Sequence, residues 1–187
     1  PFQEEKEDYF LFMGRFITRK GVFTALEATK AAGVKLKMAG QLSSEISLQD
    51  LKKWDHAEYV GFADVARRAE LMKNAKATLC PSIYLEPFCG VHAESMLCGT
   101  PVITTNFGVF PETVENGVNG YRCDTLNDFV EAIKNIDEIN PNAVRTTADK
   151  FTMREVSKQY QKWFDDLYQV YLSTTSPTIK GWHNIEG

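Results

Sequence analysis

The sequence lacks the features that place a protein in a membrane, on nucleic acid or around a metal ion. It has no apolar run long enough to cross a bilayer, and its first residues do not resemble a secretory signal peptide. The four cysteines have no Cys-x-x-Cys spacing, and no metal motif of the Asp-x-Asp type occurs. The net charge is −4 and no basic face is evident, which argues against a nucleic-acid partner. We expect a cytoplasmic protein with no metal, no cofactor and no transmembrane segment.

The composition is that of a globular domain. The chain has 187 residues, of which 43% are hydrophobic and 25% charged, enough apolar material for a core of its own. Because it begins Pro-Phe-Gln without a methionine, we expect a fragment of a longer protein. We expect a single domain over 1–187, with its core at about 9–172 and an irregular tail at 173–187.

Apolar runs of strand length alternate with segments of helical spacing. Strands are expected at 9–13, 34–39, 58–60, 76–81, 101–105 and 120–124. Helices are expected from about Gly90 to Gly99 and at 22–32, 47–54, 64–74, 111–115, 126–136, 141–148 and 152–172. This alternation predicts the α/β class, with a Rossmann-like, doubly wound parallel sheet and helices on both faces. Val65, Leu71 and Met72 are expected to face the core.

The stretch from Pro81 to Pro101 organises the chain, because it joins a buried strand to a short helix through a tight loop. The leading N–H groups of a helix have no partners within it, and its dipole favours negative charge, so such a helix start accepts anions. Pro87 leaves the backbone N–H groups of the next residues to face the ligand; these are Phe88, Cys89, Gly90 and Val91. Gly90 has no side chain and permits a close approach.

Two carboxylates flank this helix start. Glu86 lies just before the turn, and Glu94 lies one turn into the helix with its side chain leaning toward the N-terminus. Carboxylates repel a bare phosphate but accept hydrogen bonds from hydroxyl groups. A ligand with phosphates in the middle and polyols at both ends, a nucleotide sugar, would satisfy both the carboxylates and the N–H groups.

Other loops follow predicted strands and would line the same sheet edge, where ligands bind in open α/β folds. Arg15 and Lys20 would grip a diphosphate, Arg with its planar fork and Lys as a point charge. From spacing alone, solvated loop cations are the more common reading of such residues. The loop that begins with Gly61 and Phe62 is a candidate for the base pocket.

Three motifs give the chain a resemblance to a known family. Glu86 and Glu94, with seven residues between them, resemble the Glu-x7-Glu signature of retaining glycosyltransferases with the GT-B fold, the glycosyltransferase 4 family (group 1). The loop from Gly14 to Gly21 is similar to the family's Gly-Arg…Lys-Gly loop, and Gly108 to Val114 is similar to a third motif. The resemblance covers about residues 9–172, all in the C-terminal, donor-binding half. The chain departs from the family where Gly108-Val109 replaces the usual pair of glycines.

The resemblance implies metal-independent sugar transfer from a nucleotide diphosphate donor to an acceptor glycan or other hydroxyl compound, with retention, in polysaccharide or glycoconjugate biosynthesis. Glu86, Arg15 and Lys20 would be the catalytic residues. Glu86 would contact the transferred sugar and Glu94 the ribose, while Gly14 would belong to the donor loop. The acceptor domain, N-terminal in this family, is absent from this chain; it would provide any peripheral membrane attachment. The last helix would pack against that domain.

Three alternatives stay open. The first is a glycoside hydrolase that uses Glu86 and Glu94 as an acid and nucleophile pair, but it leaves Arg15 and Lys20 unexplained. The second is a nucleotide-sugar-binding module with no turnover of its own. The third is an α/β domain without nucleotide affinity, which leaves three ordered motifs unexplained. The aromatic side chains of the final helix are read as core rather than as a cofactor site; they are Tyr160, Trp163, Phe164, Tyr168 and Tyr171.

Overall fold

The computed structural model describes residues 1–173, so nearly all of the expected irregular tail lies outside the described residues. The chain divides into two compact units, Pro1–Ala148 and Asp149–Gly187. In the described part, no helix is both long enough and apolar enough to span a membrane.

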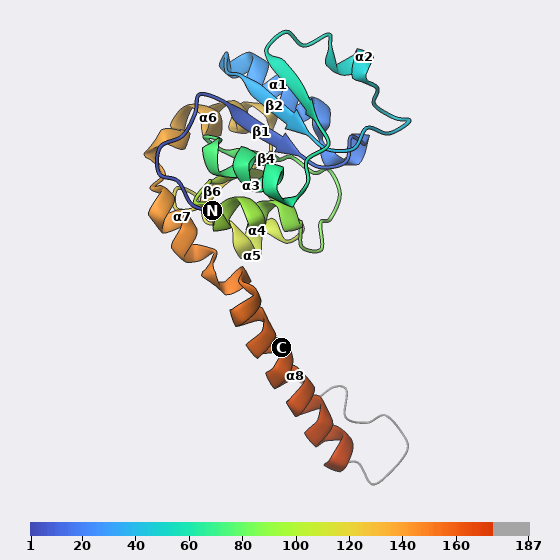
Figure 1. The fold of residues 1–187 in the computed structure, drawn as a ribbon, viewed down its shortest axis with the longest axis vertical. Coiled ribbons are helices and arrows are strands. Elements are labelled where there is room, and N and C mark those ends of the chain that lie inside the picture. The colour runs from blue at the N-terminus through green and yellow to red at the C-terminus, as the bar shows by residue number, and fades with distance from the viewer. Residues whose placement is uncertain (174–187) are drawn as a thin grey trace. The chain divides into compact units, whose positions relative to one another are not determined.

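The first unit is built on a parallel sheet of six strands, ordered β3-β2-β1-β4-β5-β6 (Figure 1). The strands are β1 (Phe10–Met13), β2 (Leu36–Ala39), β3 (Ala57–Gly61), β4 (Thr78–Cys80), β5 (Val102–Thr105) and β6 (Gly120–Cys123). Each lies within two residues of its predicted bounds, and the predicted α/β doubly wound class is confirmed. The strand order reverses between β1 and β4, which makes their carboxyl ends the place where a ligand crevice forms in such folds.

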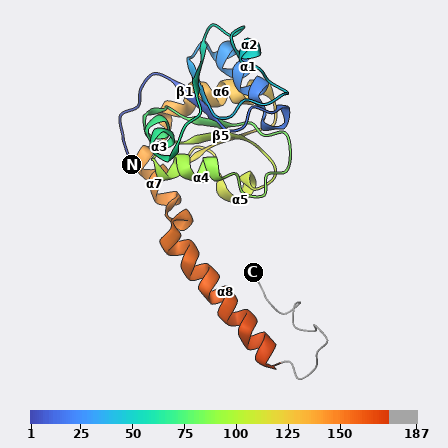
Figure 2. The same cartoon turned by 45° about the vertical axis from the view of Figure 1, so that its right-hand side comes forward.

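Helices cover both faces of the sheet. On one face α1 (Val22–Ala32) packs against α6 (Leu126–Asn135), and on the other α4 (Gly90–Leu97) packs against α3 (Val65–Asn74) and α7 (Pro141–Thr147); Figures 1 and 2 show the two layers. The remaining elements of the unit are α2 (Leu48–Leu51), α5 (Phe110–Thr113), and the 3-10 turns η1 (Thr18–Lys20) and η2 (Ile136–Glu138). This covering on both faces explains why all four residues of β1 are buried.

The helix starts agree with the capping residues in the sequence. Ser47 caps α2 in a capping box with Asp50, and the Asp64 carboxylate accepts a hydrogen bond from the backbone N–H of Arg67. Leu71 and Met72 are buried as expected, but Val65 is 81% exposed and its predicted core position is wrong. Val65 shares a helix face with Met72, yet it occupies the first helical position, and that turn extends beyond the core.

The second unit contains η3 (Asp149–Phe151) and the long helix α8 (Met153–Ser173). None of the side chains of α8 is buried, and its aromatic residues are exposed. The reading of this aromatic stripe as core is therefore wrong for the described residues, because no second layer of its own unit covers the helix there. Packing of α8 against another domain stays a prediction.

Candidate functional site

The loops that follow β1, β4 and β5 are joined by main-chain hydrogen bonds. The N–H of Ile83 donates to the carbonyl of Arg19 at 2.9 Å, and the N–H of Val109 donates to the carbonyl of Glu86 at 3.0 Å. The sequence predicted that these loops share one edge of the sheet, and the bonds bring them into contact there.

Two glycines make this contact possible. Gly21 has φ 70°, and a Cβ atom built there would lie 1.8 Å from the carbonyl oxygen of Pro81. Gly108 has φ 67°, and its Cβ would lie 2.7 Å from the backbone nitrogen of Glu86. The loop that contains Gly108-Val109 therefore packs closely on the backbone of Glu86. Gly108, the glycine that this chain keeps, lies at the point of contact.

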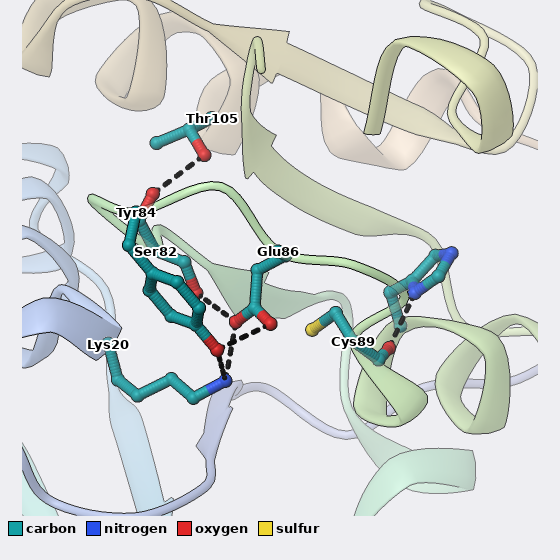
Figure 3. Close-up of polar contacts among 7 residues, drawn as sticks. Lys20, Ser82, Tyr84, Glu86, Cys89 and Thr105 are labelled. Atoms are coloured by element: carbon teal, nitrogen blue, oxygen red, sulfur yellow. Dashed lines mark hydrogen bonds and ion pairs between the residues drawn. The ribbon is translucent and has the colours of Figure 1, made fainter. Parts of the chain in front are cut away.

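A partly buried polar network joins Lys20 and Glu86 (Figure 3). Glu86 is only 4% exposed and forms an ion pair with Lys20 through Oε1. The Ser82 hydroxyl donates to Oε1 at 2.6 Å, and the Tyr84 hydroxyl donates to Oε2 at 2.6 Å. The Lys20 Nζ also donates to the Tyr84 hydroxyl at 2.9 Å. Thr105 at the end of β5 fixes the loop by donating to the Ser82 carbonyl at 2.9 Å.

The network keeps both groups charged. Burial alone would raise the pKa of Glu86, but the hydrogen bonds from Lys20, Ser82 and Tyr84 more than offset it, and the pKa lies below its ordinary value. Burial alone would lower the pKa of Lys20, but the bonds to Glu86 and Tyr84 raise it above its ordinary value. A permanent cation therefore stands at the switch point of the sheet.

Reasoning from the sequence did not single out Ser82 and Tyr84 individually. Both carry hydroxyl groups in the short segment before Glu86, and a buried acid needs such donors. That clustering of hydroxyl residues before an acidic residue and a proline is the signal that identifies them in the sequence.

Glu94 forms an ion pair with another residue of the chain. Its Oε2 pairs with the guanidinium of Arg68 on α3, and both side chains are partly exposed, 43% and 34% respectively. No motif pointed to Arg68, because the two residues meet only through the packing of α3 on α4.

The start of α4 offers unpaired backbone donors. The N–H groups of Gly90 and Val91 find no acceptor among the described residues, and a Cβ atom built on Gly90 would meet no atom of another part of the chain within 4 Å. The helix begins after Cys89, which has φ 58° and ψ 71° and is the only non-glycine residue with a positive φ in the described part. A hydrogen bond from the Cys80 thiol, opposed by burial and assisted by His92, lowers the pKa of Cys89 to about 5.

The left-handed backbone at Cys89 predicts that a glycine variant is more stable than an alanine variant, the reverse of the usual order. Both Cys89→Gly and Cys89→Ala remove the thiol, but only alanine keeps a Cβ in the left-handed region, which costs roughly 1–2 kcal/mol. After the larger unfolded-state entropy of glycine is subtracted, we expect the glycine variant to be more stable by about 1 kcal/mol. Urea denaturation measures the difference; an alanine variant as stable as the glycine variant would show that the residue carries no strain.

The other predicted site residues lie on the loops but outside the network. Arg15 is exposed, and its guanidinium has no hydrogen-bond or ion-pair partner within residues 1–173. Gly14 directly follows β1, and its N–H donates to the carbonyl of Ala39 at 3.0 Å. Gly61 ends β3 with φ 87°, and Phe62 beside it is 76% exposed. Their roles toward a donor stay predictions.

The sheet order defines a Rossmann-like domain with charged loops at its switch point. Residues 1–150 match the family model of "Glycosyl transferases group 1", and the chain belongs to this family. It is 33% identical over 122 residues to a glycogen synthase of Mycobacterium tuberculosis, covering 60% of this chain and 29% of the relative. It is 30% identical over 168 residues to the glycosyltransferase MJ1178 of Methanocaldococcus jannaschii, covering 87% and 46%.

Solved structures agree with this assignment. AviGT4, a glycosyltransferase involved in avilamycin A biosynthesis, superposes with a TM-score of 0.76 at 25% identity, covering 88% of this chain and 52% of that one. HepE of Anabaena, solved with UDP-glucose, shares the fold with a TM-score of 0.68 at 20% identity, covering 86% and 49%. The fold is thus that of one half of a GT-B glycosyltransferase. The chain spans about half or less of the length of these proteins.

Proposed function

We propose that this chain binds a nucleotide-diphosphate sugar and supplies the donor half of a hexosyltransferase that acts on an acceptor hydroxyl with retention. The observation that carries the proposal is the juxtaposition of a permanent cation, Lys20, with a helix start whose first N–H groups are unpaired. Both favour a diphosphate, and both lie at the switch point of the sheet. The acceptor would bind a second domain outside this chain.

In this proposal each group meets one part of the donor. Arg15, Lys20 and the start of α4 face the diphosphate, and Glu86 faces the transferred sugar. Glu94 faces the ribose, and Gly61 with Phe62 face the base. As the bond to the sugar breaks, the sugar becomes cationic and the diphosphate gains negative charge. Fixed donors at the place where charge develops stabilise the transition state, by about 3 kcal/mol for one donor.

The geometry does not favour Glu86 as the general acid of a two-carboxylate hydrolase. Such an enzyme needs a general acid with a raised pKa, so that it holds its proton at neutral pH. The pKa of Glu86 is lowered instead, and its two oxygens already accept three hydrogen bonds.

Calorimetric titration tests the proposal. UDP, GDP and ADP are titrated into the chain, followed by the matching sugar nucleotides and by pyrophosphate. Saturable binding of one nucleoside diphosphate is the expected result and names the base. No binding of any of the three, in this chain and in the full-length protein, would contradict the proposal.

Glu94→Ala is expected to weaken binding of that nucleoside diphosphate about tenfold, because a hydrogen bond to a charged group contributes roughly 1.5–3 kcal/mol. Pyrophosphate has no ribose, so its affinity should not change. Glu70→Ala is the control, since Glu70 is a half-exposed carboxylate of α3 that pairs with Lys73 and Asn74. Equal affinity of wild type and Glu94→Ala for the nucleotide would remove the ribose role.

A further inference from the structure

The hydroxyl of Tyr84 bridges the two charged groups of the site. It donates its hydrogen to Oε2 of Glu86 at 2.6 Å, so it can only accept the bond from Lys20 at 2.9 Å. Figure 3 shows the ring lying between the loop of Glu86 and the side chain of Lys20. The direction of both bonds is fixed by chemistry, because an ammonium group donates and a carboxylate accepts.

Counting donors and acceptors shows what the network leaves unused. An ammonium group has three N–H donors, and Lys20 uses one on Glu86 and one on Tyr84. The third finds no acceptor among the described residues. A carboxylate offers about four lone-pair sites. Oε1 of Glu86 has two donors, Lys20 and Ser82, while Oε2 has only Tyr84. One N–H and one lone pair therefore remain, on groups that share the Tyr84 hydroxyl.

We propose that Tyr84 is a positioning residue for the sugar donor: its hydroxyl occupies one lone pair of Glu86 Oε2 and directs the remaining one to a hydroxyl of the transferred sugar, while the third N–H of Lys20 stays available to a diphosphate oxygen. This rests on the proposed donor site and adds a residue that no motif of the sequence assigns. Tyr84 does not itself touch the donor in this proposal; it acts through Lys20 and Glu86, which do.

The ring is held independently of its hydroxyl. The guanidinium of Arg19 lies 5.6 Å from the ring centroid and the Nζ of Lys20 lies 5.1 Å from it. The neighbouring residue Ile83 is tied to the Arg19 carbonyl through its backbone. Tyr84→Phe therefore keeps the ring and the Lys20–Glu86 ion pair and removes only the bridge.

The test compares two affinities in each protein. UDP, GDP and ADP and their glucose, N-acetylglucosamine and mannose conjugates are titrated into wild type and Tyr84→Phe. The quantity compared is the affinity for a sugar nucleotide divided by the affinity for its free diphosphate. For the sugar nucleotide with the highest ratio in wild type, we expect this ratio to fall about tenfold in Tyr84→Phe. Affinity for the free diphosphate should change less than threefold, because the cation remains. Tyr9→Phe is the matched control, since it also removes a tyrosine hydroxyl bond, from Tyr9 to the carbonyl of Leu71 at 2.7 Å.

The outcomes separate the two proposals. A general loss of stability would lower both affinities together, and Tyr9→Phe should do no more than that. If the diphosphate binds wild type but the sugar preference is unchanged in Tyr84→Phe, the positioning role is overturned and the donor site stands. If wild type and the full-length protein bind none of the ligands, the donor site fails and the role of Tyr84 fails with it.

Discussion

Lys20→Met is expected to abolish measurable binding of a nucleoside diphosphate and to lower the free energy of unfolding by about 3 kcal/mol. The first effect follows from the loss of the cation of the proposed donor site. The second follows from Glu86, which is 4% exposed and would be left without its counter-charge. The hydroxyl groups of Ser82 and Tyr84 still donate to Glu86, so the loss of stability should lie at the lower end of the range seen when one partner of a buried ion pair is removed.

Two further variants make this result specific. Lys20→Met combined with Glu86→Gln removes both charges and should recover most of the lost stability, because no buried carboxylate is left unpaired. Lys53→Met removes an exposed cation paired with Asp50 and should change stability by less than about 0.5 kcal/mol. Urea denaturation gives the stabilities and calorimetry the affinities. A Lys20→Met variant as stable as wild type would show that the pair does not hold the loops.

The same pair sets a pH window. The pKa of folded Glu86 is lowered, so its contribution is complete above its unfolded value near 4.5 and is lost as the pH falls through the folded pKa. The pKa of folded Lys20 is raised, so its contribution is complete below 10.5 and is lost as the pH rises through the folded pKa. Between these limits the ion pair contributes evenly to stability.

Gly21→Ala is expected to lower the free energy of unfolding by more than about 3 kcal/mol and to remove nucleotide binding. A Cβ at this position would lie 1.8 Å from the Pro81 carbonyl oxygen, so the loops after β1 and β4 must separate. Lys20 is the adjacent residue and would move away from Glu86 with its loop.

Gly33→Ala is the matched control for this variant. Gly33 has φ 72° and ψ 30°, nearly the conformation of Gly21 at φ 70° and ψ 30°, but no atom lies within 4 Å of its Cβ position. Its cost should be that of the backbone alone, about 1 kcal/mol. Equal losses in the two variants, measured by urea denaturation, would mean that the close approach to Pro81 contributes nothing.

The sequence predicted the sheet well because its signals are local. The run Tyr9–Met13 is apolar and ends at a glycine, and Asp64 is a strong helix cap; neither depends on distant residues. Val65 was misread because periodicity gives a face but not how far the core extends along the helix. The aromatic stripe of α8 was misread because an apolar face does not say what covers it.

The polar partners were harder to predict. Glu86 and Lys20 were each expected to meet a ligand, yet their bond to one another spans 66 residues of sequence and depends on the pairing of β1 with β4. The bond between Arg68 and Glu94 depends in the same way on how α3 packs on α4. Such contacts follow from strand order and helix packing, and neither is encoded in a short motif.

The strand order has a consequence for how the protein reaches its working form. β1 lies beside β4, while β2 and β3 are both added on its other side. The residues that meet at Lys20 and Glu86 are brought together only when a long loop containing both outer strands closes, and closing such loops is entropically slow. A newly made chain would therefore carry its cationic loop well before the carboxylate that pairs with it emerges. The proposed site would form only after the chain through β5 and Val109 has folded, because Thr105 and Val109 bond the loop that carries Glu86.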